Sequence, residues 1–409
     1  MLEKIGLWLG LFLLVGGQVA ARDNPVPSQP TQVRLRSPAL KAHRISLVNG
    51  KTFNLNLAEG FAIKVAAQGL KRVRFMAKSP DGRLFLTDMF DLTDNRKGKV
   101  YILSGFDPQK GQFRTVTTYL SQLRNPNSIA FYTDKDGVQW LYLALTDRLL
   151  RYRYTSGENA PSNPPQVLAT FPDYGLSYKY GGWHLTRTVT IGPDEKVYVS
   201  VGSSCNACEE KEAIRATILT MDPDGANPHT FARGLRNAVG LKWVGSQLYA
   251  TDMGADHLGD DKPEDRLYTI ADQKNYGWPY CYEYNSRVYT DPKFNHTGSK
   301  FNCAQVPSAY AAFPAHSAAL GLEYFDASHT PELSKAFLVA LHGSGKRRLG
   351  RGYALVRVQK GLPVQEFING FWQNGTVYGR PADVLSIGTD QFLFTDDHAG
   401  VVYYVFKQT

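Results

Sequence analysis

Short apolar and aromatic segments recur along the chain, and each ends at a polar residue. The steps between the end points are 59, 56, 49, 90 and 54 residues, so four of the five lie near one period. The segments are LFLTD ending at Asp88, LYLALTD at Asp147, VYVSVGS at Ser203, LYATD at Asp252, FLVALH at His342 and FLFTD at Asp396.

Each of these segments sits within the same local pattern. A strand and a turn such as Pro80-Asp81-Gly82 come before it, and a third strand and usually a fourth come after it. Four antiparallel strands per unit, repeated six times, predict an all-β fold, a six-bladed β-propeller. The 90-residue step predicts an insertion at about residues 256–319.

The last unit has no fourth strand after Phe406, whereas Gly60–Gln68 is a spare segment with strand alternation. We therefore expect this N-terminal strand to close the ring as the outer strand of the last blade, because closure removes exposed sheet edges. The propeller is expected to span residues 45–409.

The N-terminal residues read as targeting sequence. Residues 1–21 combine a charged start, an apolar run and small residues before a cut near Ala21, which predicts a signal peptide. A retained membrane anchor is the alternative. Residues 22–44 are rich in Pro and Ser and are expected to form a mobile leader. The protein is thus expected to be secreted or periplasmic.

Composition narrows the classes of partner. The chain has 46 Lys and Arg against 37 Asp and Glu, a net charge of +9, but the basic residues are dispersed. No basic block indicates nucleic-acid binding, and no later segment is expected to enter a membrane stably. The charge is also compatible with attraction of an anionic ligand.

The four cysteines suggest two disulfides in an exported chain. Sequence proximity favours Cys205–Cys208 and Cys281–Cys303, although three pairings are possible. In an intracellular protein the CxxC motif would instead indicate half of a zinc site, but the sequence has no second CxxC to complete it.

Propeller geometry places two sets of polar residues at one mouth of the central channel. Residues before each first strand share a face with residues that end each second strand, which is a binding-site arrangement. For the Asp ends the alternative is that they only cap strand turns. The first set is Arg124-Asn125, His184, Arg236-Asn237, His316 and Arg380, and the second is Asp88, Asp147, Ser203, Asp252, His342 and Asp396.

Several segments in this order resemble one known family, the soluble pyrroloquinoline-quinone (PQQ) sugar dehydrogenases. They are WHLTRTVTIGPDE from Trp183, GLRNAVGL from Gly234, TDMGADHLGDD from Thr251, NYGWPYCY from Asn275, HGS from His342 and GRPADV from Gly379. The resemblance covers about residues 60–406 and is closest to the aldose sugar and sorbosone dehydrogenase branch.

The resemblance implies roles for three residues. His184 stands eight positions before the Gly-Pro-Asp turn and matches the general base that takes the sugar hydroxyl proton. Arg236 and Asn237 match the pair that contacts the quinone oxygens, with Arg236 also catalytic. The chain departs at Ala238 and Val239, where Pro-Gln is common.

A further departure concerns the orientation of the catalytic base. Ser203 stands where family members often carry an acid near the catalytic His. If an acid normally orients this His, its loss puts the tuning of His184 in doubt.

The resemblance also implies calcium. The carbonyls of Gly254 and Ala255 match positions that hold the Ca²⁺ bridging to the quinone. A second, structural Ca²⁺ is expected at four nearby acids, with an exposed acidic loop as the alternative; the acids are Asp256, Asp260, Asp261 and Glu264.

PQQ carries three carboxylates, so further cations are expected around it. Arg380 matches a family arginine placed against them, and Arg347 or Arg348 is expected to supply another. Asn125 at the channel mouth completes the candidate cofactor contacts.

The sequence thus predicts an enzyme, a PQQ- and Ca²⁺-dependent dehydrogenase that oxidises an aldose or related sugar. Electrons would pass to an external acceptor, since no CxxCH haem motif is present. One rival is a calcium-dependent sugar lactonase that uses channel acids, and the other is a propeller that binds without catalysis.

Overall fold

The protein is described here by a computed structural model, which covers residues 39–172 and 184–408. The expected signal peptide, residues 1–21, and the expected leader up to residue 38 lie outside these residues. None of the helices in the described ranges has the length and apolar character needed to cross a bilayer.

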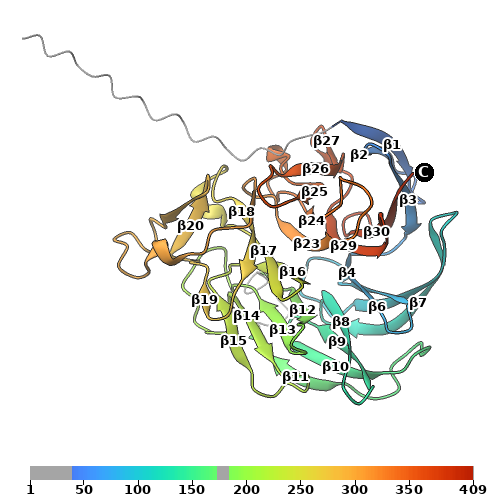
Figure 1. Ribbon diagram of the computed structural model, residues 1–409, viewed down its shortest axis with the longest axis horizontal. Helices are drawn as coiled ribbons and strands as arrows, with labels where there is room; N and C mark the ends of the chain where they lie inside the picture. The colour runs from blue at the N-terminus through green and yellow to red at the C-terminus, as the bar shows by residue number, and fades with distance from the viewer. Residues whose placement is uncertain (1–38, 173–183, 409) are drawn as a thin grey trace, which may run out of the picture. The chain divides into compact units, whose positions relative to one another are not determined.

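The described chain forms the predicted six-bladed β-propeller, with four antiparallel strands at the core of each blade (Figure 1). Blades 1 and 2 use consecutive segments, and blade 3 adds a later, short strand in parallel to its fourth strand. Blade 1 is β4 (Val73–Lys78), β5 (Leu84–Asp88), β6 (Gly98–Asp107) and β7 (Gln112–Leu123). Blade 2 is β8 (Ser128–Thr133), β9 (Gln139–Ala144), β10 (Arg148–Tyr154) and β11 (Gln166–Thr170). Blade 3 is β12 (Arg187–Ile191), β13 (Val197–Val201), β14 (Thr217–Met221), β15 (His229–Arg233) and the short β19 (Lys274–Asn275).

The remaining blades recruit distant strands. Blade 4 is β16 (Ala238–Val244), β17 (Gln247–Asp252), β18 (Asp265–Ile270) and β22 (Ala311–Phe313). Blade 5 is β23 (Ala319–Phe325), β24 (Ala336–Leu341), β25 (Ala354–Val358) and β26 (Gln365–Asn369), extended by β2 (Thr52–Ala58) and β1 (Leu40–Ser46). Blade 6 is β29 (Pro381–Gly388), β30 (Gln391–Asp396), β31 (Val401–Lys407) and β3 (Phe61–Ala67).

Short elements lie outside the blades. They are the pairs β20 (Cys281–Tyr284) with β21 (Arg287–Thr290) and β27 (Trp372–Gln373) with β28 (Thr376–Val377), and the 3-10 turns η1 (Asp256–Leu258), η2 (Cys303–Gln305) and η3 (Arg347–Leu349).

The ring is closed both at its inner strands and at its outer strands. The first strands contact one another in the order β4, β8, β12, β16, β23, β29 and back to β4. At the outside, β3 pairs antiparallel with β31, so the predicted closure by Gly60–Gln68 is confirmed. The second strands β5, β13 and β24 are buried along their whole length, in keeping with their largely apolar sequences.

Two expected boundaries differ from the structure. Leu40–Arg44, expected in the leader, belong to β1, whose partner β2 pairs with β26 of blade 5 through Asn56 and Asn369. The insertion expected at about residues 256–319 contains β18 and β22, which complete blade 4, so the extra segment lies between them. The disulfide Cys281–Cys303 links the two ends of much of that segment.

The repeated Thr-Asp ends of the second strands tie the ring together. Each threonine hydroxyl donates to a carbonyl at the first strand of the next blade. These bonds are Thr87 to Asn127 (2.7 Å), Thr146 to Leu185 (2.9 Å), Thr251 to Leu320 (2.8 Å) and Thr395 to Arg74 (2.7 Å).

The aspartates of the same repeats act within their own blade. Asp88 accepts the backbone N–H groups of Lys71 and Arg72, and Asp396 accepts that of Arg380. The alternative weighed from the sequence, that these acids cap backbone turns, therefore holds for Asp88 and Asp396. Asp147 instead binds the side chain of Arg148.

Candidate active site

A cavity of about 700 Å³ lies at the centre of the ring, over the ends of the first strands. Its ionisable lining residues are Arg74, His184, Arg236, Asp256, Asp265, His316, His342 and Lys346. Its apolar lining includes Val239 and Leu320, which pack together in one buried cluster. The cavity thus combines apolar side chains with three Arg or Lys and two Asp side chains.

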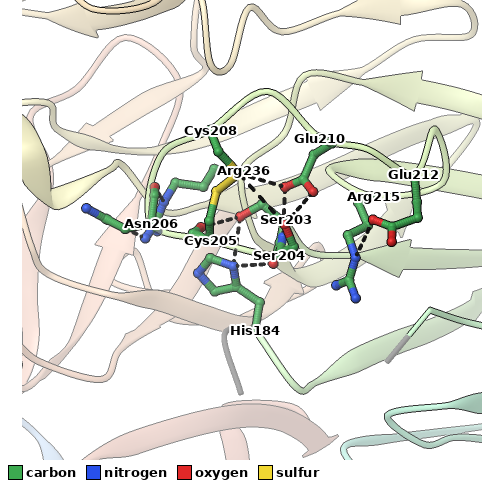
Figure 2. The surroundings of a disulfide bond; sticks show 10 residues. All are labelled: His184, Ser203, Ser204, Cys205, Asn206, Cys208, Glu210, Glu212, Arg215 and Arg236. Carbon is green, nitrogen blue, oxygen red and sulfur yellow. Dashed lines mark hydrogen bonds and ion pairs between the residues drawn. A yellow bond between two sulfur atoms is a disulfide. The ribbon is translucent and has the colours of Figure 1, made fainter. Parts of the chain in front are cut away.

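His184 enters this cavity with a fixed ring orientation. Its Nδ1 lies 2.9 Å from both the carbonyl oxygen and the hydroxyl oxygen of Ser203 (Figure 2). The Ser203 hydroxyl donates its own proton to the Cys205 carbonyl at 2.9 Å, so it accepts from the imidazole. Two acceptors at Nδ1 place the proton there and leave the lone pair on Nε2, the atom a general base uses.

The surroundings of His184 favour its neutral form. Burial, followed by the charge of Arg236, lowers the pKa of His184 well below its ordinary value. Ser203 is fully buried and orients the ring without a negative charge. Ser203 thereby supplies the orientation of His184 that an acid was expected to give.

Arg236 and Asn237 are positioned from two sides. Their backbone N–H groups donate to the two carboxylate oxygens of Asp252, at 3.2 and 2.7 Å. The guanidinium donates from Nε to the Asn206 carbonyl at 2.7 Å and from Nη2 to Asn206 Oδ1 at 2.9 Å. Burial lowers the pKa of Arg236, and burial raises that of Asp252 to about 7.

The other two cavity histidines are held by both ring nitrogens. His316 contacts Asp256 at 2.7 Å and the Gly259 carbonyl at 2.8 Å, and the bond to Asp256 raises the pKa of His316. His342 Nε2 contacts Asp397 at 2.7 Å, while burial lowers the pKa of His342 to about 4. These roles are structural, so His184 is the histidine suited to proton transfer.

Four cofactor contacts expected from the sequence are not in the cavity lining. Arg380 turns to the carbonyl of Gly343 (2.7 Å) and lies over the Tyr353 ring. Arg347 and Arg348 are exposed, and Asn125 Nδ2 donates to the Thr93 carbonyl at 2.8 Å. Arg380 and Asn125 therefore support loops beside the cavity.

The four acids expected to share a second Ca²⁺ do not converge on one point. Each contacts a cationic group instead: Asp256 pairs with His316, Asp260 with Lys346 and Arg348, Asp261 with Arg351, and Glu264 with Arg266. Among the described residues, metal-ligand spacing occurs only at Cys205, Cys208 and Glu210, and those cysteines form a disulfide.

The loop expected to offer carbonyl ligands lies at the cavity edge. Gly254 lines the cavity, and its N–H donates to Asp265 at 2.8 Å, whereas Ala255 is buried beside it. Burial raises the pKa of Asp265 to about 6.

The sequence reasoning missed several lining residues. Arg74 lies inside β4 rather than before it, and Lys346 follows the turn that holds His342. A charge between Val73 and Phe75 in an apolar strand was the available signal for Arg74. Leu92 lines the same cavity and is 51% exposed, and nothing in its local sequence distinguishes it.

The backbone at Gly202 passes between the two candidate groups. A Cβ at this position would lie 2.5 Å from Asn237 Oδ1 and 2.7 Å from His184 Cβ. We expect Gly202→Ala to displace both side chains and to lower the sugar oxidation expected from the sequence by about 100-fold. Steady-state assays would measure the change.

Gly388→Ala is the matched control for this variant, because its Cβ would meet no atom closer than 3.8 Å. It should retain wild-type activity. Equal activities for the two variants would contradict the placement of His184 and Asn237 around Gly202.

Comparison with known proteins adds to this geometry. The structure is similar to the holo form of the pyranose dehydrogenase PQQ domain from Coprinopsis cinerea, with a TM-score of 0.71 and 18% identity over 87% of this chain and 97% of that chain. It is also similar to the calcium structure of Trichoderma reesei carbohydrate-active enzymes family AA12, with a TM-score of 0.69 and 16% identity over 93% and 100%. These similarities establish the fold.

Sequence comparison identifies the family. An uncharacterized protein of Borreliella burgdorferi is 26% identical over 379 residues, which cover 85% of this chain and 94% of that protein. Residues 55–368, most of the propeller, match the family described as TrAA12-like. The chain therefore belongs to the TrAA12-like family, in agreement with the family resemblance found in its sequence.

Proposed function

We propose that this protein is a PQQ-dependent sugar dehydrogenase that oxidises the C1 hydroxyl of an aldose or related sugar. The observation that carries the proposal is the placement of His184 and Arg236 in one central cavity, with His184 Nδ1 2.9 Å from two oxygens of Ser203. The similar Coprinopsis structure, a PQQ domain of a pyranose dehydrogenase, supports the same function.

The donor set of the cavity suits PQQ. Arg236, Arg74 and Lys346 offer N–H donors to three carboxylates, with Arg74 also paired to Asp397 and Lys346 to Asp260. Val239 and Leu320 offer an apolar surface for flat rings. PQQ bound here would supply the acceptor for a hydride from the sugar. Arg236 would hold the cofactor and stabilise negative charge as the hydride arrives.

His184 then acts as the general base. Its Nε2 takes the proton of the sugar hydroxyl as the C1 hydrogen leaves, while Ser203 keeps the other nitrogen protonated. The low pKa of His184 keeps the base form populated and favours prompt release of the proton. The resulting electrons are proposed to go to an external acceptor.

We propose the Gly254 and Ala255 carbonyls as Ca²⁺ ligands at the cavity edge. A hard cation prefers such oxygens, and Ca²⁺ would supply Lewis acidity beside the cofactor. The calcium structure among the similar proteins supports Ca²⁺ as the metal. We also propose export, which the two disulfides support.

The geometry is less suited to the lactonase rival. That enzyme needs several channel acids on a metal, but Asp88, Asp252 and Asp396 already bind backbone amides. The binding-propeller rival rested on Ser203, Ala238 and Val239. Ser203 orients His184 and Val239 lines the cavity, so these two departures are compatible with catalysis.

Reconstitution tests the proposal. We expect purified apoprotein to reduce an artificial electron-acceptor dye with an aldose only after PQQ and Ca²⁺ are added, and a chelator to reverse the activation. Dye reduction followed by absorbance, with a panel of aldoses, measures the result. Lactone hydrolysis without PQQ would instead establish the lactonase, and sugar binding with neither activity would establish the binding protein.

A further inference from the structure

A four-residue loop closed by the Cys205–Cys208 disulfide contacts the supports of both candidate catalytic groups (Figure 2). The loop follows Ser203, which comes two residues after β13 of blade 3. The two cysteines are partly exposed, with Cα atoms 6.2 Å apart.

Asn206, inside this loop, binds the Arg236 guanidinium through two atoms. Its carbonyl and its Oδ1 accept the parallel Nε–H and Nη2–H bonds, at 2.7 and 2.9 Å. Such a fork fixes the plane of a guanidinium as well as its position. Asn206 Oδ1 also accepts the backbone N–H of Asp256 at 2.9 Å, which connects blade 3 to the loop between β17 and β18 of blade 4.

The same loop supports His184 through Ser203. The Cys205 carbonyl accepts the Ser203 hydroxyl proton, and this bond turns the hydroxyl oxygen toward His184 Nδ1 as an acceptor. Glu210 fixes the adjoining peptide by accepting the N–H and the hydroxyl of Ser204, at 2.7 and 2.6 Å. Both peptide carbonyls that matter, those of Cys205 and Asn206, belong to the loop that the disulfide closes.

We propose that the Cys205–Cys208 loop is a shared positioning element, with Asn206 as the positioning residue for Arg236 and Cys205 supporting His184 through Ser203. The disulfide restricts the orientations of the Cys205 and Asn206 peptides. One covalent link therefore helps to position both His184 and Arg236. The role in PQQ binding rests on the proposed function, whereas the positioning of Arg236 is a property of the protein alone.

The test uses the full propeller protein and two readouts. One is the hydrogen-exchange rate of the Arg236 Nε proton, measured by NMR with ¹⁵N-arginine and assigned by its disappearance in Arg236→Lys. The other is PQQ affinity from fluorescence quenching. The variants are Asn206→Ala, Asn206→Asp and the double variant Cys205→Ser/Cys208→Ser, with Cys281→Ser/Cys303→Ser as the matched disulfide control.

Loss of the side-chain bond in Asn206→Ala should weaken PQQ binding by about 10-fold and accelerate Nε exchange by at least about that factor. The Cys205→Ser/Cys208→Ser variant should change both readouts in the same direction. Asn206→Asp keeps an acceptor oxygen and should restore slow exchange, and the control should match the wild type. Circular dichroism would verify that each variant is folded.

Wild-type exchange rates in both Asn206→Ala and Cys205→Ser/Cys208→Ser would overturn the positioning role. If the wild type binds no PQQ but exchange accelerates in both variants, the proposed function fails and the positioning role stands. Equal acceleration in the Cys281→Ser/Cys303→Ser control would also overturn the proposal, because the effect would then be general loosening.

Discussion

Replacing His184 with alanine is expected to lower dye-coupled sugar oxidation by about 100- to 10,000-fold, the usual contribution of a positioned general base. PQQ affinity should change much less, because the proposed cofactor contacts come from Arg236, Arg74 and Lys346. The measurements are kcat, KM and a separate PQQ titration. The loss should appear in kcat, since the imidazole acts on the reacting hydroxyl.

A second cavity histidine provides the control. His342→Gln keeps a donor toward Asp397, whose contact with His342 is structural, and should lower kcat by less than about 10-fold. In the wild type, kcat should fall on the acid side only below pH 6.5. Burial and Arg236 lower the pKa of His184, so the imidazole stays neutral and able to accept a proton below that pH. Full activity in His184→Ala would refute the assignment of the base.

Replacing Arg236 with alanine is expected to weaken PQQ binding by about 100-fold. The substitution removes a buried cation, leaves the Asn206 carbonyl without its donor and leaves Asn206 Oδ1 with the Asp256 N–H alone. Arg236→Lys should recover only part of the loss, because an ammonium group does not reproduce the planar fork. Fluorescence quenching by PQQ measures both affinities.

The same substitution should alter the pH dependence of the remaining activity. Arg236 lowers the pKa of His184, so its removal should raise that pKa and move the acid limb toward higher pH. Arg347→Ala is the control, since Arg347 is exposed and outside the cavity lining. A comparable loss in the Arg347 variant would show that overall charge, rather than the Arg236 contact, controls binding.

The propeller was predictable because its signals are local. Each blade repeats a buried strand, a turn and a flanking strand within about 50 residues, and the spare strand near Phe61 supplied what the last blade lacked. The β1–β2 addition to blade 5 was missed because its partner, β26, lies more than 300 residues away. Nothing local indicates which blade receives such a hairpin.

The site was predictable only where a motif fixes both backbone and side chain. His184, Arg236 and Asn237 line the cavity as expected. The backbone of Arg380 was placed at the channel mouth, but its side chain turns to the carbonyls of a neighbouring turn. Side-chain direction depends on tertiary acceptors that sequence position does not reveal.

The acidic residues of the repeats also differ from their expected role. Asp252 looked like a channel acid, yet both of its oxygens accept backbone N–H groups of the Arg236–Asn237 pair. Its effect on the site is therefore indirect, through the backbone that carries the two side chains. Carboxylates in repeated motifs were candidates for chemistry and proved to be parts of the scaffold.

The pairing of β3 with β31 has a consequence for biosynthesis. The strand near Phe61 pairs with residues near Val405, at the other end of the chain. A nascent chain therefore cannot close the ring until those residues have left the ribosome. A truncated transcript or a proteolytic cut that removes β31 would leave β30 and β3 as unpaired sheet edges. Such truncated chains should aggregate or be degraded rather than persist as partly active enzyme.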